Sequence, residues 1–216
     1  MSASRVRSQA ATLVIACGAL AKEIVEIIAA NGWDHVRIQC LPAELHNRPE
    51  RIPEAVRGKI RQARGEFERI FVAYADCGTG GLLDAVLEEE GVTRLPGAHC
   101  YQFYAGTELF RELSDAEPGT FYLTDFLTRH FDRLVMQVLG LDRHPQLMPE
   151  YFGNYRKLVY LAQTEDAALK EKARQAATTL GLDFECRFTG YGELGDSLAD
   201  FERRQVTVAA PVAQSD

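Results

Sequence analysis

Cysteine is the residue type in this sequence with the most chemistry to offer. Thiolates bind soft metal ions and attack electrophiles, and a thiol at a helix N-terminus has a lowered pKa. Cys186, flanked by Phe184 and Phe188, is expected to be an ordinary buried residue. The remaining four cysteines are expected at or just after the ends of β-strands: Cys17, Cys40, Cys77 and Cys100.

Three cysteines and one histidine form the leading ligand set. Cys17, Cys77 and Cys100 each lie between an expected strand and an expected helix, and His46 lies in the loop after the second strand. A single cysteine in such a place is often only a small buried hydrophobe, but the repeated placement favours a shared site. Three cysteines and a histidine suit tetrahedral zinc, and three cysteines with an open position suit an iron–sulfur cluster. The sequence therefore predicts a zinc or iron–sulfur site, although the spacing is not that of a zinc finger.

Two other functions fit the same residues. A metal-free enzyme would use Cys77 as its nucleophile and His99 or His46 as the base. A non-enzymatic accessory protein would use the same pocket to deliver a corrinoid, a folate or a metal. The number of converging thiols separates these hypotheses, because one thiol favours a nucleophile and three or more favour a metal.

Glycines and an aromatic residue near the cysteines are expected to contact a small-molecule ligand or cofactor. Gly18, Gly78 and Gly80 would let the backbone approach such a ligand closely, and Tyr101 would form part of an aromatic wall beside Cys100. The segment 76–81 also resembles a phosphate-binding loop, but it lacks the P-loop lysine and the dinucleotide fingerprint. A tight strand-to-helix turn explains its glycines equally well.

The elements that must position these residues alternate between strand and helix. This alternation predicts an α/β fold, a mostly parallel sheet with helices on both faces in a Rossmann-like three-layer arrangement. Ligands of such sheets bind beyond the carboxyl ends of the strands, where the cysteines are expected. The expected strands are 12–16, 36–40, 69–75, 93–96, 120–123, 158–162, 183–188 and 205–209, and the expected helices are 19–30, 54–67, 82–90, 99–113, 125–139, 167–180 and 194–202.

Length and composition set the remaining limits. The chain has 216 residues, 46% of them hydrophobic and 25% charged, which fits a single domain over 12–209 with a flexible N-terminus (1–11) and a C-terminal tail (210–216). A net charge of −7 argues against non-specific nucleic-acid binding, which needs a basic face. The irregular segment 143–156 is expected to be a lid or an interface, in the latter case within a homo-oligomer.

Charges and cysteines also indicate the compartment. The most apolar stretch, 13–30, carries Lys22, Glu23 and Glu26, which argues against a membrane span. The first twelve residues lack the apolar run of a signal peptide. We therefore expect a cytoplasmic protein, in which an odd number of cysteines is kept reduced or binds metal.

The chain resembles a bacterial and archaeal family catalogued as domain of unknown function 1638, from Thr12 to about Leu198. Members are encoded beside corrinoid-dependent methyltransferases and their reductive activators. The resemblance implies a role in one-carbon metabolism, such as demethylation of methylated amines, with a corrinoid methyltransferase system as partner. It also implies that Cys17, His46, Cys77 and Cys100 belong to the family's polar signature. The segments that carry it are 16–19, 41–47, 76–78, 96–101 and 119–124.

Overall fold

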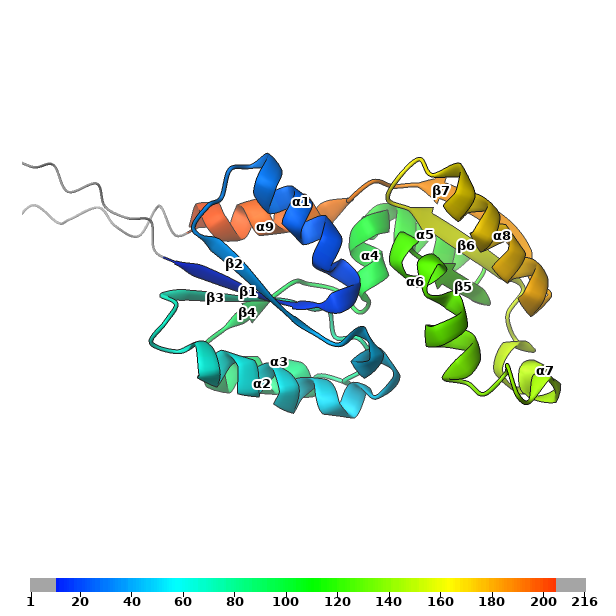
Figure 1. Ribbon diagram of the computed structural model, residues 1–216, viewed down its shortest axis with the longest axis horizontal. Helices are drawn as coiled ribbons and strands as arrows, with labels where there is room; N and C mark the ends of the chain where they lie inside the picture. The colour runs from blue at the N-terminus through cyan, green and yellow to red at the C-terminus, as the bar shows by residue number, and fades with distance from the viewer. Residues whose placement is uncertain (1–10, 205–216) are drawn as a thin grey trace, which may run out of the picture. The chain divides into compact units, whose positions relative to one another are not determined.

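The computed structural model describes residues 11–204, and these divide into two compact units, the first ending at Cys100 and the second beginning at Tyr101. Each unit holds its own sheet, and every strand pair in both sheets is parallel (Figure 1). The structure is therefore α/β with helices layered on parallel sheets, as the alternation of strand and helix predicts. The prediction of one domain over 12–209 stays a prediction.

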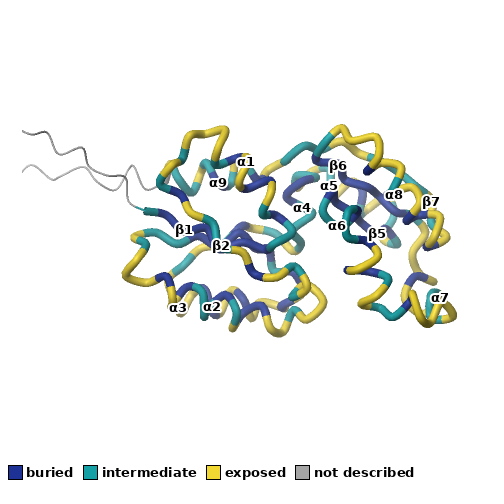
Figure 2. Tube along the Cα trace, viewed as in Figure 1, coloured by how far each residue is buried: buried dark blue, intermediate teal, exposed yellow. Residues whose placement is uncertain are grey.

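The first sheet has the strand order β2-β1-β3-β4. Its central strand β1 is buried at all six positions, because it has a neighbour on each side and helices over both faces (Figure 2). Ala16 of β1 pairs with Cys40 of β2 and with Ala73 of β3, so these three strands reach the same edge together. The strands are β1 (Thr12–Cys17), β2 (Val36–Leu41), β3 (Arg69–Ala73) and β4 (Thr93–Arg94).

Helix α1 covers one face of this sheet, and α2 and α3 cover the other (Figure 1). Helix α1 buries Ile24 and Ile27, and α2 buries Val56 and Ile60, as expected from apolar residues three or four positions apart. The helical elements of the unit are η1 (Gly18–Leu20), α1 (Ala21–Ala30), η2 (Ala43–Asn47), η3 (Pro49–Arg51), α2 (Ile52–Ala63) and α3 (Leu82–Glu90).

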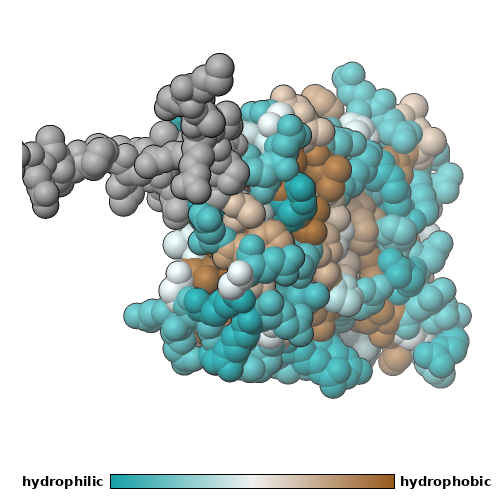
Figure 3. Space-filling model, turned by 60° about the vertical axis from the view of Figure 1, so that its left-hand side comes forward, coloured by the Kyte–Doolittle hydropathy of each residue, from teal (hydrophilic) through white to brown (hydrophobic). Residues whose placement is uncertain are grey.

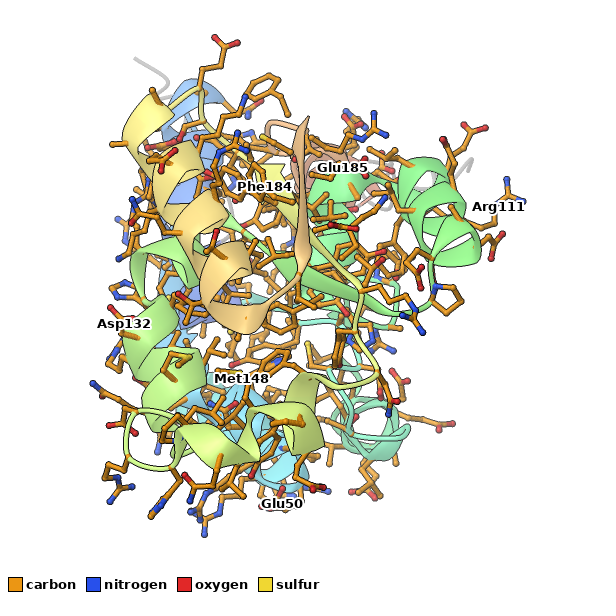
Figure 4. The ribbon with its side chains drawn as sticks, turned by 90° about the vertical axis from the view of Figure 1, so that its right-hand side faces the viewer. Glu50, Arg111, Asp132, Met148, Phe184 and Glu185 are labelled. Atoms are coloured by element: carbon orange, nitrogen blue, oxygen red, sulfur yellow. The ribbon has the colours of Figure 1, made fainter. Side chains whose placement is uncertain are left out.

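The second sheet has the order β5-β6-β7, and alternate residues of its central strand enter two different cores. Leu158 and Tyr160 of β6 pack on the side of α6 and α8, whereas Val159 and Leu161 pack with Leu113 of α5. In Figure 4, Phe184 and Glu185 of β7 likewise lie on opposite sides of the strand, Phe184 toward α8. The strands are β5 (Thr120–Leu123), β6 (Lys157–Ala162) and β7 (Asp183–Phe188).

A buried carboxylate joins the carboxyl ends of β5 and β6. The carboxylate of Asp125 accepts hydrogen bonds from the Tyr160 hydroxyl at 2.6 Å, from the backbone nitrogen of Gln163 at 3.0 Å and from the Thr164 hydroxyl. Its side chain is almost fully enclosed, and Arg129 lies 3.6 Å away. The carboxylate therefore fixes the start of α6 to the end of β6. The helical elements of this unit are α4 (Cys100–Ala105), α5 (Thr107–Ala116), α6 (Asp125–Arg129), η4 (Asp132–Gln137), η5 (Pro145–Leu147), α7 (Met148–Phe152), α8 (Ala167–Leu180) and α9 (Glu193–Arg204).

Two predicted helices are interrupted. The helix expected over 99–113 is divided into α4 and α5 by Gly106, whose φ of +76° is incompatible with a helix. The helix expected over 125–139 is divided into α6, which ends at Arg129, and the π-helical segment η4, which begins at Asp132. The strand expected over 205–209 lies outside the described residues.

The surface and the helices were compared with the features of a membrane-spanning protein. Hydrophilic side chains cover much of the face that Figure 3 shows. Within residues 11–204, no helix is both long enough and apolar enough to cross a membrane.

Candidate functional site

The carboxyl edge of the first sheet brings together most of the residues singled out in the sequence. Cys17 is the last residue of β1, and Cys77 follows β3 after two further buried residues and the half-buried Asp76. Cys100 is the first residue of α4, directly after the loop that follows β4, and His46 comes from η2 after β2. These positions follow from the parallel topology, since every such strand ends at the same edge.

Cys77 has an unusual backbone conformation. Its φ is +50°, which is the left-handed region, and among the described residues no other non-glycine residue has a positive φ. A side chain in this region costs about 1 kcal/mol or more, and such conformations collect at functional sites. The backbone at Cys77 is therefore held by its surroundings.

Asp76 provides part of that hold. Its carboxylate accepts hydrogen bonds from the Thr79 hydroxyl at 2.6 Å, from the Gly81 amide at 2.9 Å and from the Gly80 amide at 3.2 Å. These bonds, led by that of Thr79, lower the pKa of Asp76. Two amides of the loop already donate to Asp76 and are not free to bind an anion. The geometry therefore supports the interpretation of segment 76–81 as a tight turn and not as a phosphate-binding loop.

The loop that carries Cys100 is attached to the loop that carries Cys77. The amide of Asp76 donates to the carbonyl of Gly97 at 3.1 Å, and the amide of Cys77 donates to that of Ala98 at 2.8 Å. Arg94 donates to Gly97 as well, at 3.3 Å. The backbones on either side of the two thiols are thus fixed to each other.

The sulfur of Cys77 receives two hydrogen bonds from side chains and one from the backbone. Its Sγ lies 3.0 Å from the Sγ of Cys100, the His46 side chain forms the second bond, and the backbone amide of Cys100 forms the third. Cys100 first and His46 second lower the pKa of Cys77 to about 5, despite a burial that acts in the opposite direction. The pKa of Cys100 is raised well above its ordinary value, because its proton is shared with Cys77 and its sulfur is buried. These contacts favour the ionised form at Cys77 and the protonated form at Cys100.

Cys17 lies in the same region but is in a different protonation state. It is 7% exposed, and burial raises its pKa to about 11. The side chain of Tyr74 lies near it, but the buried Tyr74 hydroxyl has no hydrogen-bond partner among the described residues, and burial raises the pKa of Tyr74. Negative charge on Cys77 raises the pKa of Cys17 further. Cys17 is therefore favoured as a neutral thiol.

Comparison with known proteins places the chain in a family. Residues 40–198 match the family described as "Protein of unknown function (DUF1638)". The chain belongs to this family. No curated protein and no solved structure matches it. The part of the chain that matches the family contains His46, Cys77, His99 and Cys100, whereas Cys17 precedes it.

The other histidine and cysteine candidates are distributed around and beyond this site. His99 adjoins Cys100 in the chain, and burial lowers its pKa, so its imidazole is neutral at neutral pH. Cys40 lies on the edge strand β2 and is exposed. Cys186 is half-buried and not fully buried as expected, because β7 is an edge strand, and its side chain packs against the core of the second unit.

The candidate metal ligands of this family member do not form a ready metal cage. Within residues 11–204, no three histidine, cysteine or acidic side chains are arranged closely enough to hold a metal ion. Two thiolates on one tetrahedral zinc lie about 3.8 Å apart, given Zn–S bonds of about 2.3 Å. Cys77 and Cys100, at 3.0 Å, would have to separate, and the buried Cys17 would have to lose its proton. The donor set suits zinc in its chemistry, whereas its present geometry suits a hydrogen-bonded thiol pair.

The residues predicted to contact a ligand have different structural roles. A Cβ on Gly18 would lie 3.1 Å from the carbonyl oxygen of Leu41, so this glycine allows close approach of two backbone segments. Gly78 and Gly80 have positive φ and shape the Asp76 turn. Tyr101 lies in the second unit and stacks on Tyr122, with ring centroids 5.2 Å apart. Ligand contact by these residues stays a prediction.

Two residues that the sequence analysis did not assign to the site contribute to it. Tyr74 lies near Cys17, and the role of Asp76 in the turn explains the position of Cys77. The signal for Asp76 was present, because an aspartate followed by threonine and glycines is typical of side-chain-capped turns. No local pattern indicates the Tyr74 contact.

The irregular segment 143–156 forms part of a shallow pocket in the second unit. Met148 of α7, labelled in Figure 4, lies at this pocket. Its lining residues include no thiol, carboxylate or imidazole, and Tyr155 supplies their one ionisable side chain. The lining residues are Met148, Pro149, Phe152, Gly153, Tyr155, Leu180, Gly181 and Leu182.

Proposed function

We propose that this protein is a thiol-dependent enzyme whose nucleophile is the Cys77 thiolate. The observation that carries the proposal is the pair of hydrogen bonds to the Cys77 sulfur, from Cys100 at 3.0 Å and from His46. A neighbouring donor or imidazole that stabilises a thiolate is the ordinary way in which proteins activate cysteine. The left-handed backbone at Cys77 supports the proposal, because strain of this kind is typical of reactive residues.

Each neighbour has a distinct part in the proposed reaction. The Cys77 sulfur forms a bond to an electrophilic atom of the substrate while the bond to the leaving group breaks, and the leaving group keeps the electron pair. His46, bonded to the same sulfur, is placed to give a proton to that leaving group. Cys100 holds the thiolate in position before attack. His99, neutral because of burial, is a second base within the same loop.

The substrate class that we propose is a carrier of a methyl or other one-carbon group. A thiolate is a suitable acceptor for such a group, since its sulfur can bond to the methyl carbon while the donor keeps the electron pair of the broken bond. This part of the proposal rests on the expected association with corrinoid methyltransferases, which would supply or receive the group.

The ionisation of Cys77 is the first property to measure. Thiolate ultraviolet absorbance would be titrated on reduced wild type and on Cys77→Ser, and iodoacetamide adducts would be located by mass spectrometry at each pH. We expect the difference titration to have a midpoint near pH 5 and the adduct at Cys77 to follow it. Cys17→Ser is the matched control, because that thiol has a raised pKa and its loss should leave the midpoint near pH 5. A midpoint for Cys77 above pH 8 would contradict the proposal.

Metal binding is a second candidate, favoured by the four donors at one sheet edge, Cys17, His46, Cys77 and Cys100. It requires the two sulfurs to separate to about 3.8 Å, as above. Metal analysis and a visible spectrum of protein purified without oxygen test it directly. Stoichiometric zinc or iron that Cys77→Ser loses would establish a metal site and displace the metal-free proposal. Protein without metal that still reacts at Cys77 would support the nucleophile.

A further inference from the structure

We propose that Cys77 and Cys100 are a two-electron redox pair, oxidised to a disulfide by a small hydroperoxide. The inference rests on the proposed function, because it uses the Cys77 sulfur as the attacking atom. Its own basis is the 3.0 Å separation of the two sulfurs. A disulfide bond is about 2.05 Å long, so the sulfurs need to approach by only about 1 Å.

The backbone already holds the two cysteines in register. Two hydrogen bonds, from the amides of Asp76 and Cys77 to the carbonyls of Gly97 and Ala98, join the loops on which the thiols lie. A third contact joins the sulfur of Cys100 to the backbone of Ala75. A bond between the sulfurs therefore needs side-chain rotation and little movement of the chain.

The other thiols of the described chain lie in other places. Cys17 is buried at the end of β1, and Cys40 is exposed on the edge strand β2. Cys186 belongs to β7 of the second unit. Cys100 is thus the thiol placed to react with an oxidised Cys77.

Burial decides the size of the oxidant. Cys77 is 4% exposed, so the in-line approach that a bulky protein disulfide needs at this sulfur is blocked. Hydrogen peroxide and small organic hydroperoxides are compact enough to reach it.

The reaction is balanced in two steps. The Cys77 sulfur attacks the terminal oxygen of the hydroperoxide, the O–O bond breaks, and the alkoxide leaves as an alcohol after taking a proton from solvent or His46. Cys77 is then a sulfenic acid. The Cys100 sulfur, having lost its proton, attacks the Cys77 sulfur, the S–O bond breaks, and the oxygen leaves as water. One hydroperoxide is reduced and two thiols become a disulfide, which an external dithiol returns to the reduced form by exchange.

The test uses the wild-type protein, reduced and then treated with one equivalent of hydrogen peroxide. Free thiols are alkylated, and tryptic peptides are analysed by mass spectrometry. Cys77 and Cys100 fall in separate peptides because Arg94 lies between them. We expect a cross-linked pair of these peptides that disappears on treatment with a dithiol.

Three variants distinguish the outcomes. Cys100→Ser should accumulate a sulfenic acid at Cys77 that dimedone traps, and Cys77→Ser should form no cross-link. Cys17→Ser should form the Cys77–Cys100 cross-link as wild type does. A thiolate at Cys77 by absorbance, with no cross-link in folded wild type or with a cross-link to Cys17, would overturn this inference and leave the proposed function standing. Loss of the low-pH thiolate itself would overturn both.

Discussion

The sulfurs of Cys77 and Cys100 lie 3.0 Å apart although the residues are 23 positions apart in the chain. One end of this pair is a turn closed by Asp76, and the other is a loop bound to that turn through backbone hydrogen bonds. The two sulfurs are in direct contact, and this contact favours the thiolate form of Cys77. The thiolate is the form of cysteine that attacks electrophiles.

Removal of the Cys100 thiol should raise the pKa of Cys77 more than removal of His46, because Cys100 is the larger stabilising contact. A hydrogen bond to a charged group is worth about 1.5 kcal/mol or more, so the Cys100→Ala midpoint should rise by about one pH unit or more. Thiolate absorbance titration measures it. Cys17→Ala, which removes no hydrogen bond to Cys77, is the control, and an unchanged midpoint in Cys100→Ala would refute the assignment.

The stability of the reduced protein should depend on the ionisation of Cys77. Its pKa is lowered from 9.0 to about 5 on folding, so the stabilisation is absent below pH 5, grows between pH 5 and pH 9, and is complete above the unfolded value. Urea unfolding of wild type and Cys77→Ser should therefore diverge as pH rises through this window, by at most about 1.4 kcal/mol per pH unit. Parallel curves would show that Cys77 titrates alike in both states.

The backbone at Cys77 should favour glycine over alanine. Its φ of +50° is accessible to glycine without a Cβ penalty, so Cys77→Gly should be more stable than Cys77→Ala by about 1 kcal/mol. Cys186 in β7 is the matched control, since glycine is the poorer residue in a strand and the order should reverse there. Chemical denaturation of the four variants measures both differences. Alanine equal to or better than glycine at Cys77 would contradict the left-handed conformation.

Loss of the Asp76 carboxylate should loosen the turn. We expect Asp76→Ala to lower the free energy of unfolding by about 1 to 2 kcal/mol at pH 7, because three hydrogen bonds are removed from partly exposed donors. Since the pKa of Asp76 is lowered from 3.8 on folding, its electrostatic share is present above that value and is lost as pH falls further. The difference from wild type should thus shrink below pH 4. Asp115→Ala, an exposed acid of α5, should have no such effect.

Replacement of Asp125 should lower the free energy of unfolding more than replacement of Asp166, another aspartate of the second unit. Asp125→Ala leaves the Tyr160 hydroxyl and the Gln163 amide buried without their acceptor, which should cost about 3 kcal/mol or more. Asp166→Ala removes only the N-cap of α8 and should cost about 1 kcal/mol. Thermal and urea unfolding compare the two variants. Equal losses would mean that water replaces the carboxylate of Asp125.

Much of the fold could be predicted because its signals are local. The apolar run at Thr12–Cys17 predicts a buried strand, and Gly91 and Gly181 end α3 and α8 in the left-handed conformation typical of helix ends. Since parallel strands end at a common edge, the sequence alone also indicated that Cys17, Cys77 and Cys100 share one end of a sheet. The interruption at Gly106 was visible as a glycine but not as a break, because glycine is also tolerated within helices.

The order of strands and helices, and hence which thiols share an edge, follows from local patterns in the amino-acid sequence. Which of these thiols are in contact, and which is favoured as a thiolate, depends on how the loops pack in three dimensions. Periodicity depends on neighbours along the chain, whereas the pKa of Cys77 depends on a thiol 23 residues away and on His46 from another loop. Such contacts exist only when the loops after β2, β3 and β4 meet, and for that reason the same residue type is favoured as a thiolate at position 77 and as a neutral thiol at position 17.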